Sequence, residues 1–244
     1  MFALERQKKI IDTLKNDGAV FVSKLSEELG VTEETVRRDL EKLEKQELLL
    51  RTHGGAFPID EGNYEMSLEK RKKINTDSKM RLAKEAVNHI VSGDTIFLDA
   101  STTTFYIAKE LKLMKDITVI TNSIRVIDEL AGIPSLKVIG VGGFVSNNQS
   151  FVGGQAQRAI TENYFANKMF FSSKGITVNA GILESNDYEC EIKQCMLENT
   201  EKKYYIFDKS KIGRVGFAKL AKLYDIDCLI TEKELDAEYV KAIN

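Results

Sequence analysis

The sequence has little of what marks a membrane, metal-binding or disulfide-stabilised protein. Its 244 residues contain no run of about 18 apolar residues, which excludes a predicted membrane-spanning helix. No apolar signal region opens the chain, and residues 1–15 instead predict an amphipathic helix. The three cysteines, Cys190, Cys195 and Cys228, are an odd number without C-x-x-C spacing, which speaks against a disulfide framework or a zinc site. We therefore expect buried thiols in a cytoplasmic protein.

Histidine is also scarce, and basic residues are not in excess. His53 and His89 are the only histidines, and neither has a partner at metal-ligand spacing, so we expect no metal and no cofactor. The formal net charge is −2, and residues 1–57 hold 10 lysines and arginines against 11 aspartates and glutamates. Any basic surface for nucleic acid must therefore be local. The length fits about two domains.

Residues 23–56 carry the most informative pattern, which predicts two short helices, a tight turn and a hairpin. Ser23 is expected to cap a first helix that Gly30 ends, and Thr32 is expected to cap a second helix. The sequence LLLRTHGGAF then predicts a strand and a Gly-Gly turn. This order of elements is typical of a winged helix-turn-helix that binds DNA.

The second helix is predicted to be amphipathic. Val36, Leu40 and Leu43 recur at i, i+4 and i+7, which predicts one buried face. The opposite face would present its polar side chains to the DNA major groove, with Arg37 and Arg38 as the foremost contacts. A helical hairpin whose charges are only solvated surface is the alternative. The candidate DNA-contacting residues are Ser23, Thr32, Thr35, Arg37, Arg38, Lys42 and His53.

We expect a DNA-binding domain at residues 1–57, a linker at 58–76 and a larger domain at 77–244. The linker contains the run Lys70-Arg71-Lys72-Lys73. Such a run is solvated linker in one interpretation and an added phosphate contact on DNA in the other.

From residue 78 onward the pattern alternates between helices and short apolar strands. Strands are predicted at 95–100, 117–121, 136–140, 168–173, 204–208 and 227–231, and helices of 10–15 residues lie between most of them. This alternation predicts an α/β domain with a mostly parallel, helix-covered sheet.

Polar side chains follow the predicted strands, at the edge where ligands of open α/β sheets bind. Hydroxyls, amides, small residues and lysines recur there, and they favour a pocket for an anion such as phosphate. The alternative is that the Ser, Thr and Asn residues are only helix caps. These groups are Asp99 to Thr104, Thr121 to Ser123, Gly142-Gly143, Lys174-Gly175 and Asp208 to Lys211.

The sequence VTEETVRRDLEKLEKQELLLRTHGGA closely resembles the signature of the DeoR family of bacterial transcriptional regulators, with its TVRRDL core and HGGA wing. The larger domain resembles the family's sensor domain, whose fold is related to that of ribose-5-phosphate isomerase and coenzyme A transferases. In the family, motifs at matching positions surround a phosphorylated sugar or related metabolite. The effector-binding residues that this resemblance implies are Asp99, Ser101, Thr102, Thr103, Thr121, Asn122, Gly142, Gly143, Lys174, Glu189, Lys193, Asp208 and Lys211.

Two of these positions depart from the family pattern. Ser101 replaces a usual glycine, which either crowds the backbone approach to phosphate or adds a hydroxyl donor. Lys174 stands where many members carry a small residue, and its charge suits a second anionic group.

The sequence therefore predicts a repressor of a sugar-metabolism operon whose partners are double-stranded operator DNA and a phosphorylated sugar-type effector. We expect a homodimer or homotetramer, because a two-helix reader usually binds two half-sites, and we expect no membrane partner. The alternative is a sugar-phosphate isomerase with an appended DNA-binding domain, in which Asp99, Asp208 and Lys211 supply acid–base groups. A third possibility is a structural α/β module with a vestigial pocket.

Overall fold

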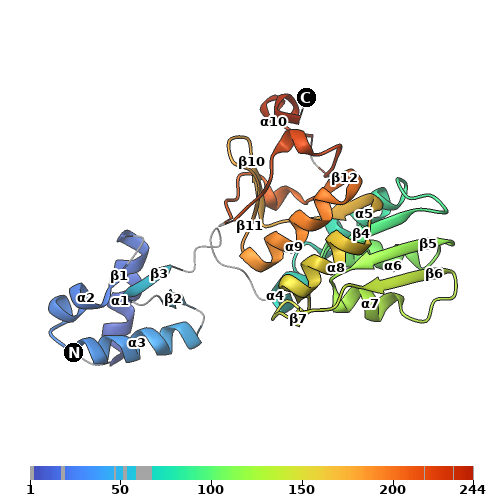
Figure 1. Ribbon diagram of the computed structural model, residues 1–244. Coiled ribbons are helices and arrows are strands. Elements are labelled where there is room, and N and C mark those ends of the chain that lie inside the picture. Colours follow the sequence, from blue (N-terminus) through green and yellow to red (C-terminus); the bar gives the residue numbers. More distant parts are fainter. Residues whose placement is uncertain are drawn as a thin grey trace. The chain divides into compact units, whose positions relative to one another are not determined.

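The computed structural model describes residues 3–17, 20–46, 48–51, 54–58, 68–216, 218–232 and 234–243. The chain divides into two compact units, Met1–Tyr64 and Glu65–Asn244, and each is described by itself (Figure 1).

The first unit is a winged helix-turn-helix. Helices α1 (Ala3–Asp17), α2 (Val22–Leu29) and α3 (Glu33–Lys45) are joined by an antiparallel sheet with the strand order β1-β3-β2. The strands are β1 (Val20–Phe21), β2 (Leu49–Arg51) and β3 (Gly55–Pro58). Apolar side chains of α1, α2 and α3 form one core, which includes Ile10, Leu25, Val36, Leu40 and Leu43.

The boundaries of α2 and α3 follow from local backbone chemistry. Gly30 adopts the left-handed conformation with φ at +61°, which ends α2. The Thr32 hydroxyl accepts a hydrogen bond from the Thr35 backbone N–H at 3.3 Å and begins α3, as the sequence predicts. The prediction for Ser23 was wrong. Phe21, with an extended backbone, is the N-cap of α2, and Ser23 lies inside the first turn. The Val22 N–H donates to the Gly54 carbonyl.

The second unit contains a six-stranded parallel sheet with the order β14-β12-β9-β4-β5-β6. The strands are β4 (Thr95–Leu98), β5 (Ile117–Thr121), β6 (Leu136–Gly140), β9 (Ala166–Phe171), β12 (Thr200–Ile206) and β14 (Cys228–Ile230). The helices are α4 (Leu68–Lys73), α5 (Thr76–Val87), α6 (Thr104–Leu111), α7 (Ile124–Leu130), α8 (Gly154–Asn163), α9 (Asp187–Glu198) and α10 (Ala237–Ile243). The expected fold class is confirmed.

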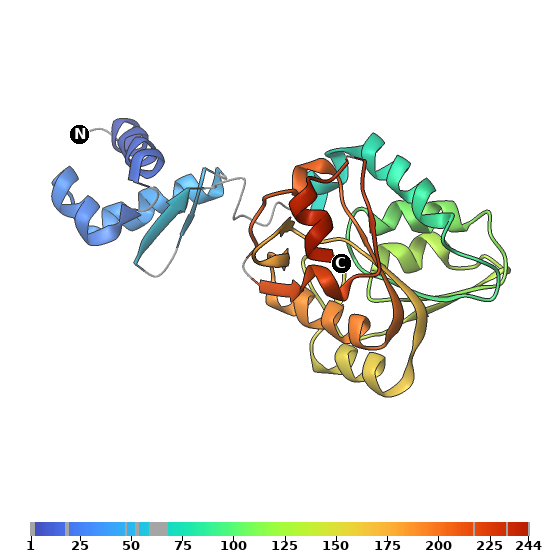
Figure 2. The same cartoon turned by 90° about the horizontal axis from the view of Figure 1, so that it is seen from above.

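Both faces of this sheet are covered by helices. On β4, Ile96 and Leu98 pack with α5, α6 and α7, whereas Phe97 between them packs in the core that contains α8 and α9. This alternation is the two-residue period of a strand that is buried on both faces. Figure 2 shows the two helical layers on opposite sides of the sheet, with α8 and α9 in yellow and orange.

Several short elements of this unit have no counterpart in the sequence prediction. A hairpin of β7 (Phe144–Val145) and β8 (Phe151–Val152) follows the Gly-Gly loop. A separate antiparallel sheet contains β10 (Gly175–Thr177), β11 (Gly181–Glu184) and β13 (Ala218–Ala221). Helix α4 lies within the expected linker, yet it belongs to the second unit, where Lys79 donates to the Arg71 carbonyl at 2.6 Å.

Candidate functional site

Helix α3 presents the predicted DNA-reading side chains to solvent. The Arg38 side chain is 74% exposed and that of Arg37 is 47% exposed. Each guanidinium meets a glutamate one turn earlier, Arg37 with Glu33 at 2.7 Å and Arg38 with Glu34 at 3.4 Å. Such exposed pairs are weak, so phosphate or base contacts can replace them.

The remaining DNA candidates are distributed around the same motif. Lys42 is exposed on α3, and the Thr35 and Thr32 hydroxyls are hydrogen-bonded to each other at 2.9 Å. Ser23 is exposed on α2. His53 lies outside the described residues, between strands β2 and β3 of the wing.

A buried ion pair holds α3 against α1, and the sequence prediction did not include it. Asp39 is 2% exposed and forms an ion pair with Arg6. Its second oxygen accepts a hydrogen bond from the Gln7 side chain at 3.0 Å. The available signal was an acidic residue at a position between Val36 and Leu40 that helical spacing places beside the apolar face.

In the second unit, Asp99 lies at the carboxyl end of β4 and is completely buried. One carboxylate oxygen accepts hydrogen bonds from the Ser101 N–H at 3.1 Å and the Thr104 hydroxyl at 2.7 Å. The other accepts from the Ser172 N–H at 3.2 Å and pairs with Lys193 at 2.9 Å. Asp99 therefore ties two strand ends and α9 together.

Lys193 is saturated by partners within the protein. Its ammonium meets the Ser172 carbonyl at 2.7 Å, the Glu184 carboxylate at 2.5 Å and Asp99. Burial acts to lower the pKa of Lys193, but Asp99, Glu184 and Glu189 outweigh it and raise the pKa above its ordinary value. An ammonium has three donors, and three acceptors surround this one. Glu184, on β11, was absent from the sequence prediction.

The hydroxyls after β4 and β5 bind mostly to nearby backbone groups. The Ser101 hydroxyl accepts from the Thr104 N–H at 3.1 Å, and Thr121 donates to the Leu98 carbonyl at 2.7 Å. Thr102 and Thr103 are buried at the start of α6. Asn122 is completely buried, and its side-chain oxygen has no hydrogen-bond partner among the described residues.

The Gly-Gly loop and Glu189 shape the neighbouring part of the edge. Gly142 and Gly143 both have positive φ, and a Cβ on Gly143 would lie 2.8 Å from the Val152 carbonyl oxygen. Only glycine therefore fits at position 143. Glu189 is buried and accepts hydrogen bonds from the Ser150 and Ser146 hydroxyls. Burial raises the pKa of Glu189.

Asp208, Lys174 and Lys211 form the charged group beyond β9 and β12. Asp208 caps the 3₁₀ turn η1 (Lys209–Lys211), accepting from the Ser210 N–H at 2.8 Å and from the Asn75 side chain at 3.0 Å. Burial lowers the pKa of Lys211 to about 8, and the charge of Lys174 adds to this effect while Asp208 and Glu184 oppose it. Lys174 itself is 7% exposed.

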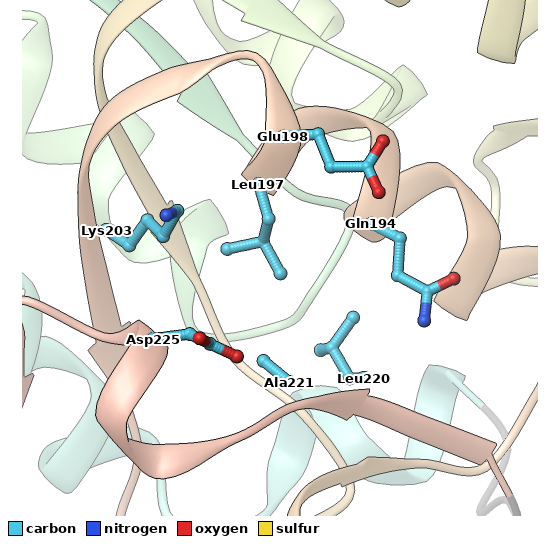
Figure 3. A pocket seen from close by; sticks show the side chains of 7 residues that line it. All are labelled: Gln194, Leu197, Glu198, Lys203, Leu220, Ala221 and Asp225. Atoms are coloured by element: carbon cyan, nitrogen blue, oxygen red, sulfur yellow. The ribbon is translucent and has the colours of Figure 1, made fainter. Parts of the chain in front are cut away.

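Two of the hollows lined by described residues of this unit contain no predicted effector residue. One, of about 330 Å³, lies between α9, β12, β13 and the 3₁₀ turn η2 (Leu223–Asp225) (Figure 3). The other, of about 720 Å³, adjoins η1 and is lined by Ser78, Arg81, Lys209, Ile212 and Glu232. Many of the predicted effector residues are buried, and they form a polar layer along the carboxyl edge of the sheet.

Two arginines near this layer were missed by the sequence prediction. Arg71 on α4 donates to the Asn148 side chain at 2.7 Å. The guanidinium carbon of Arg125 on α7 lies 3.8 Å from the centre of the Phe105 ring. Arg125 lies two residues after the strand-end group Thr121 to Ser123, so its position in the sequence is the signal that could identify it.

Each of the two units matches the model of a known domain family. Residues 6–61 match the family model of the DeoR-like helix-turn-helix domain, and residues 74–233 match that of the DeoR C terminal sensor domain. The chain is 41% identical over 244 residues to the uncharacterized HTH-type transcriptional regulator YulB of Bacillus subtilis (strain 168), covering 100% of this chain and 94% of that protein.

Two further similarities concern a repressor and an enzyme. The chain is 34% identical over 240 residues to the lactose phosphotransferase system repressor of Lactococcus lactis subsp. lactis, covering 97% of this chain and 93% of that protein. Among solved structures, ribose 5-phosphate isomerase A of Methanocaldococcus jannaschii is 15% identical with a TM-score of 0.44, covering 57% of this chain and 56% of that one. Within the described residues, no helix is long and apolar enough to cross a membrane.

Proposed function

Because the chain belongs to the DeoR family of transcriptional regulators, we propose that it represses a sugar-metabolism operon under the control of a phosphorylated sugar or related metabolite. The observation that carries the effector proposal is a pair of lysines at the carboxyl edge of the parallel sheet: Lys174, which is buried, and Lys211, which is half-buried and has a lowered pKa. The Lactococcus relative, named a lactose phosphotransferase system repressor, supports the link to sugar metabolism.

In this proposal, α3 reads the operator. Arg37 and Arg38 contact bases or phosphates from the exposed face, and Thr35 and Lys42 support them. Thr32 begins the helix beside the DNA backbone, while Ser23 and His53 contact phosphates from α2 and the wing. A homodimer or homotetramer in the cytoplasm presents two such helices to two half-sites.

In this proposal, some of the effector residues contact the ligand, and the others stabilise the loops at the carboxyl edge of the sheet. Lys174 and Lys211 bind the anionic group, together with the hydroxyls and backbone N–H groups of Thr102 and Thr103. Asn122 supplies an unpaired buried oxygen for a sugar hydroxyl.

The remaining predicted residues hold the edge in shape. Asp99, Lys193 and Glu189 are bound to other parts of the protein. They act with Ser101, Thr121 and Asp208 to fix the loops, and Gly142 and Gly143 allow the turn beside them.

The isomerase alternative is not retained, because the family and the relatives are transcriptional regulators and not enzymes. The local chemistry agrees with this conclusion. Both oxygens of Asp99 accept hydrogen bonds from the protein, and Asp208 caps a turn. Neither carboxylate is held ready to remove a proton from a substrate carbon.

The proposal is tested by measuring operator binding with and without candidate effectors. The operator is first selected from a random-sequence DNA pool with the purified protein. A panel of sugar phosphates, each paired with its unphosphorylated sugar, is then screened by thermal shift and by release of the operator. We expect at least one sugar phosphate, and not its parent sugar, to stabilise the protein and weaken operator binding. If no sugar phosphate does either, the proposed effector class is wrong.

A further inference from the structure

Asn75 forms the corner between α4 and α5. Its backbone is left-handed, with φ at +53°, and α5 begins at the next residue, Thr76. Asparagine adopts this conformation more readily than most residues other than glycine. Helix α4 is the first described helix after β3, so this corner lies at the start of the sensor unit, on the side of the chain that leads from the DNA-binding unit.

The last carbonyls of α4 are bound by side chains of α5. Lys79 is 4% exposed, and its ammonium donates to the Arg71 carbonyl at 2.6 Å and to the Ile74 carbonyl at 2.7 Å. The Thr76 hydroxyl donates to the Lys72 carbonyl at 3.4 Å. Carbonyls at the C-terminal end of a helix have no partner within that helix, so these hydrogen bonds fix α4 to α5.

The Asn75 side chain connects this corner to the 3₁₀ turn η1. Its amide donates to the Asp208 carboxylate at 3.0 Å and to the Ser210 hydroxyl at 3.3 Å. The same oxygen of Asp208 accepts from the Ser210 N–H at 2.8 Å and caps η1. The turn η1 also carries Lys211. Asn75 therefore joins the start of the sensor unit to the turn on which the proposed effector site depends.

A hollow lies between α5 and η1. This space, of about 720 Å³, is lined by Ser78 and Arg81 from α5 and by Lys209 and Ile212 from η1 and the residue after it. Because side chains do not fill it, close packing does not hold η1 against α5 at this point. The hydrogen bonds of Asn75 bridge the corner and the turn where packing is incomplete.

Asp208 links the corner to Lys211 by its charge as well as by its position. The Asp208 carbonyl accepts from the Lys211 N–H at 3.0 Å, which places the lysine one turn further along η1. Burial lowers the pKa of both Lys79 and Lys211 to about 8, and the Asp208 charge opposes this effect at each. An anion bound by Lys211 would neutralise that lysine and repel the carboxylate. Asp208 would then be left to Asn75 and Lys79, on the side of the corner.

We propose that Asn75 couples the effector site to α4: an anion bound at Lys211 tightens the hydrogen bond from Asn75 to Asp208, and this selects an arrangement of α4 with low operator affinity. The coupling rests on the proposed function for the identity of the anion and for the sense of the response. A ligand changes operator affinity only through a contact that differs between two arrangements, and Asn75 supplies that contact. Asn75 is a positioning residue, which acts through Asp208 and does not touch the ligand.

The test uses the full chain, inorganic phosphate as the probe, and hydrogen exchange of residues 68–79 as the readout. Asn75→Gly removes the amide and keeps a left-handed backbone, which glycine adopts readily. Asp116→Gly is the matched control. Asp116 is also exposed, has φ at +58°, and accepts a hydrogen bond from the Ser92 hydroxyl at 3.2 Å, but it directly precedes β5 at the amino edge of the sheet. Lys211→Ala removes the proposed phosphate contact.

Phosphate, compared with chloride at equal ionic strength, should slow the exchange of residues 68–79 about threefold or more in the wild type and in Asp116→Gly. In Asn75→Gly, phosphate should still raise the melting temperature, because the lysines remain, but should leave this exchange unchanged. Asn75→Asp keeps the shape and places a second carboxylate against Asp208, so it should behave like Asn75→Gly. Both effects of phosphate should be smaller in Lys211→Ala.

The same variants are then titrated on the operator with a sugar phosphate that releases the wild type. We expect Asn75→Gly to be stabilised by this ligand and yet to need about tenfold more of it for release, while Asp116→Gly behaves like the wild type. Equal release of Asn75→Gly and the wild type would overturn the coupling and leave the proposed function standing.

The exchange measurement can overturn the coupling without any sugar phosphate. The coupling is wrong if phosphate does not slow the exchange of residues 68–79 in the wild type, or slows it equally in Asn75→Gly. It is also wrong if Asn75→Gly and Asn75→Asp both lose the phosphate-induced rise in melting temperature, since Asn75 would then serve binding. Slowing that requires Asn75, with no sugar phosphate acting on operator binding, would support the link to α4 and refute the proposed effector class.

Discussion

The lysines at the carboxyl edge of the sheet differ in what surrounds their ammonium groups. Lys193 meets three acceptors, and the surrounding carboxylates outweigh its burial, so it stays charged and occupied. Lys211 is instead a desolvated cation whose pKa burial lowers to about 8. A phosphate would restore the charge balance of Lys211, whereas Lys193 already has its own counter-charges. Identical side chains on one edge therefore have different electrostatic surroundings.

If Lys211 binds the proposed phosphate, its lowered pKa makes that binding depend on pH. Its ammonium is protonated below about 8 in the free protein and loses its proton above that pH, while a phosphate monoester stays doubly charged. We expect phosphate affinity to fall as the pH rises from 7 to 9.5. Calorimetric titration across this range measures the fall. In Lys211→Arg the charge persists, so the fall should be smaller, and Lys79, with its pKa near 8, accounts for what remains.

Lys211 and Lys79 should also make the free energy of unfolding depend on pH, in the direction opposite to that of phosphate affinity. Their folded pKa values of about 8 lie below the ordinary value of 10.5, so the unfolded chain binds more protons between these pH values. The free energy of unfolding should therefore rise with pH in this window for the ligand-free protein. If phosphate affinity and the free energy of unfolding both fall above pH 8, the lowered pKa values assigned to these lysines are wrong.

Arg38 allows the DNA-reading role to be separated from folding. Its side chain is 74% exposed and its pair with Glu34 is weak, so Arg38→Ala should leave the melting temperature almost unchanged. Operator affinity should drop by about 1–3 kcal/mol if the guanidinium contacts a guanine. Lys45→Ala is the matched control, since Lys45 has the same kind of pair at the other end of α3. Equal operator affinities for the two variants would show that α3 is misassigned.

Helices and strands whose apolar residues recur at the regular spacing of a helix or a strand were predictable from the sequence. Helix α3 and the strands of the parallel sheet bury residues at the spacing that the sequence shows, and the sheet is covered on both faces as expected. Strands β10, β11 and β13 contain three or four residues each, too few for a period to appear. Helix α4 falls in the predicted linker because its sequence, LEKRKK, is almost wholly charged, and its place is set by tertiary contacts such as Arg71 to Asn148.

The candidate site was predictable where polar residues follow strands and unpredictable where partners come from distant elements. Glu189 and Lys193 have the spacing of a surface helix pair, yet both are buried and each is bound to other segments. Glu184, Asn75 and Arg71 reach the edge from elements that the sequence does not place there. Sequence spacing identifies neighbours within an element, whereas these partners depend on how elements pack.

Helices α1 and α3 are joined by the buried pair of Arg6 and Asp39. Asp39→Asn removes the carboxylate charge of a buried ion pair, which should destabilise the first unit by about 3–5 kcal/mol. Hydrogen exchange of the α1 and α3 amides measures this loss without reference to the second unit. The double variant Arg6→Met, Asp39→Leu should regain most of the protection. Unchanged exchange in Asp39→Asn would show that the pair contributes little to holding α3.

In the chain as a whole, helix α4 and the residues before α5 link the proposed effector-binding edge of the sheet to the segment that follows the DNA-binding unit. Asn75, between α4 and α5, donates to Asp208 at 3.0 Å, and Lys79 donates to the carbonyls of Arg71 and Ile74. A ligand that binds beside Asp208 and Lys211 therefore acts on the first described helix after β3. Such a ligand alters operator affinity only by favouring one arrangement of that region over another.

The most direct test of this account is operator binding by the wild type and by Lys211→Ala, each titrated with a sugar phosphate that releases the wild-type protein. Both proteins should bind the operator with similar affinity in the absence of the metabolite, because Lys211 lies outside the DNA-binding unit. Only the wild type should be released when the metabolite is added. A Lys211→Ala protein that responds to the metabolite as the wild type does would contradict a phosphate site at this edge of the sheet.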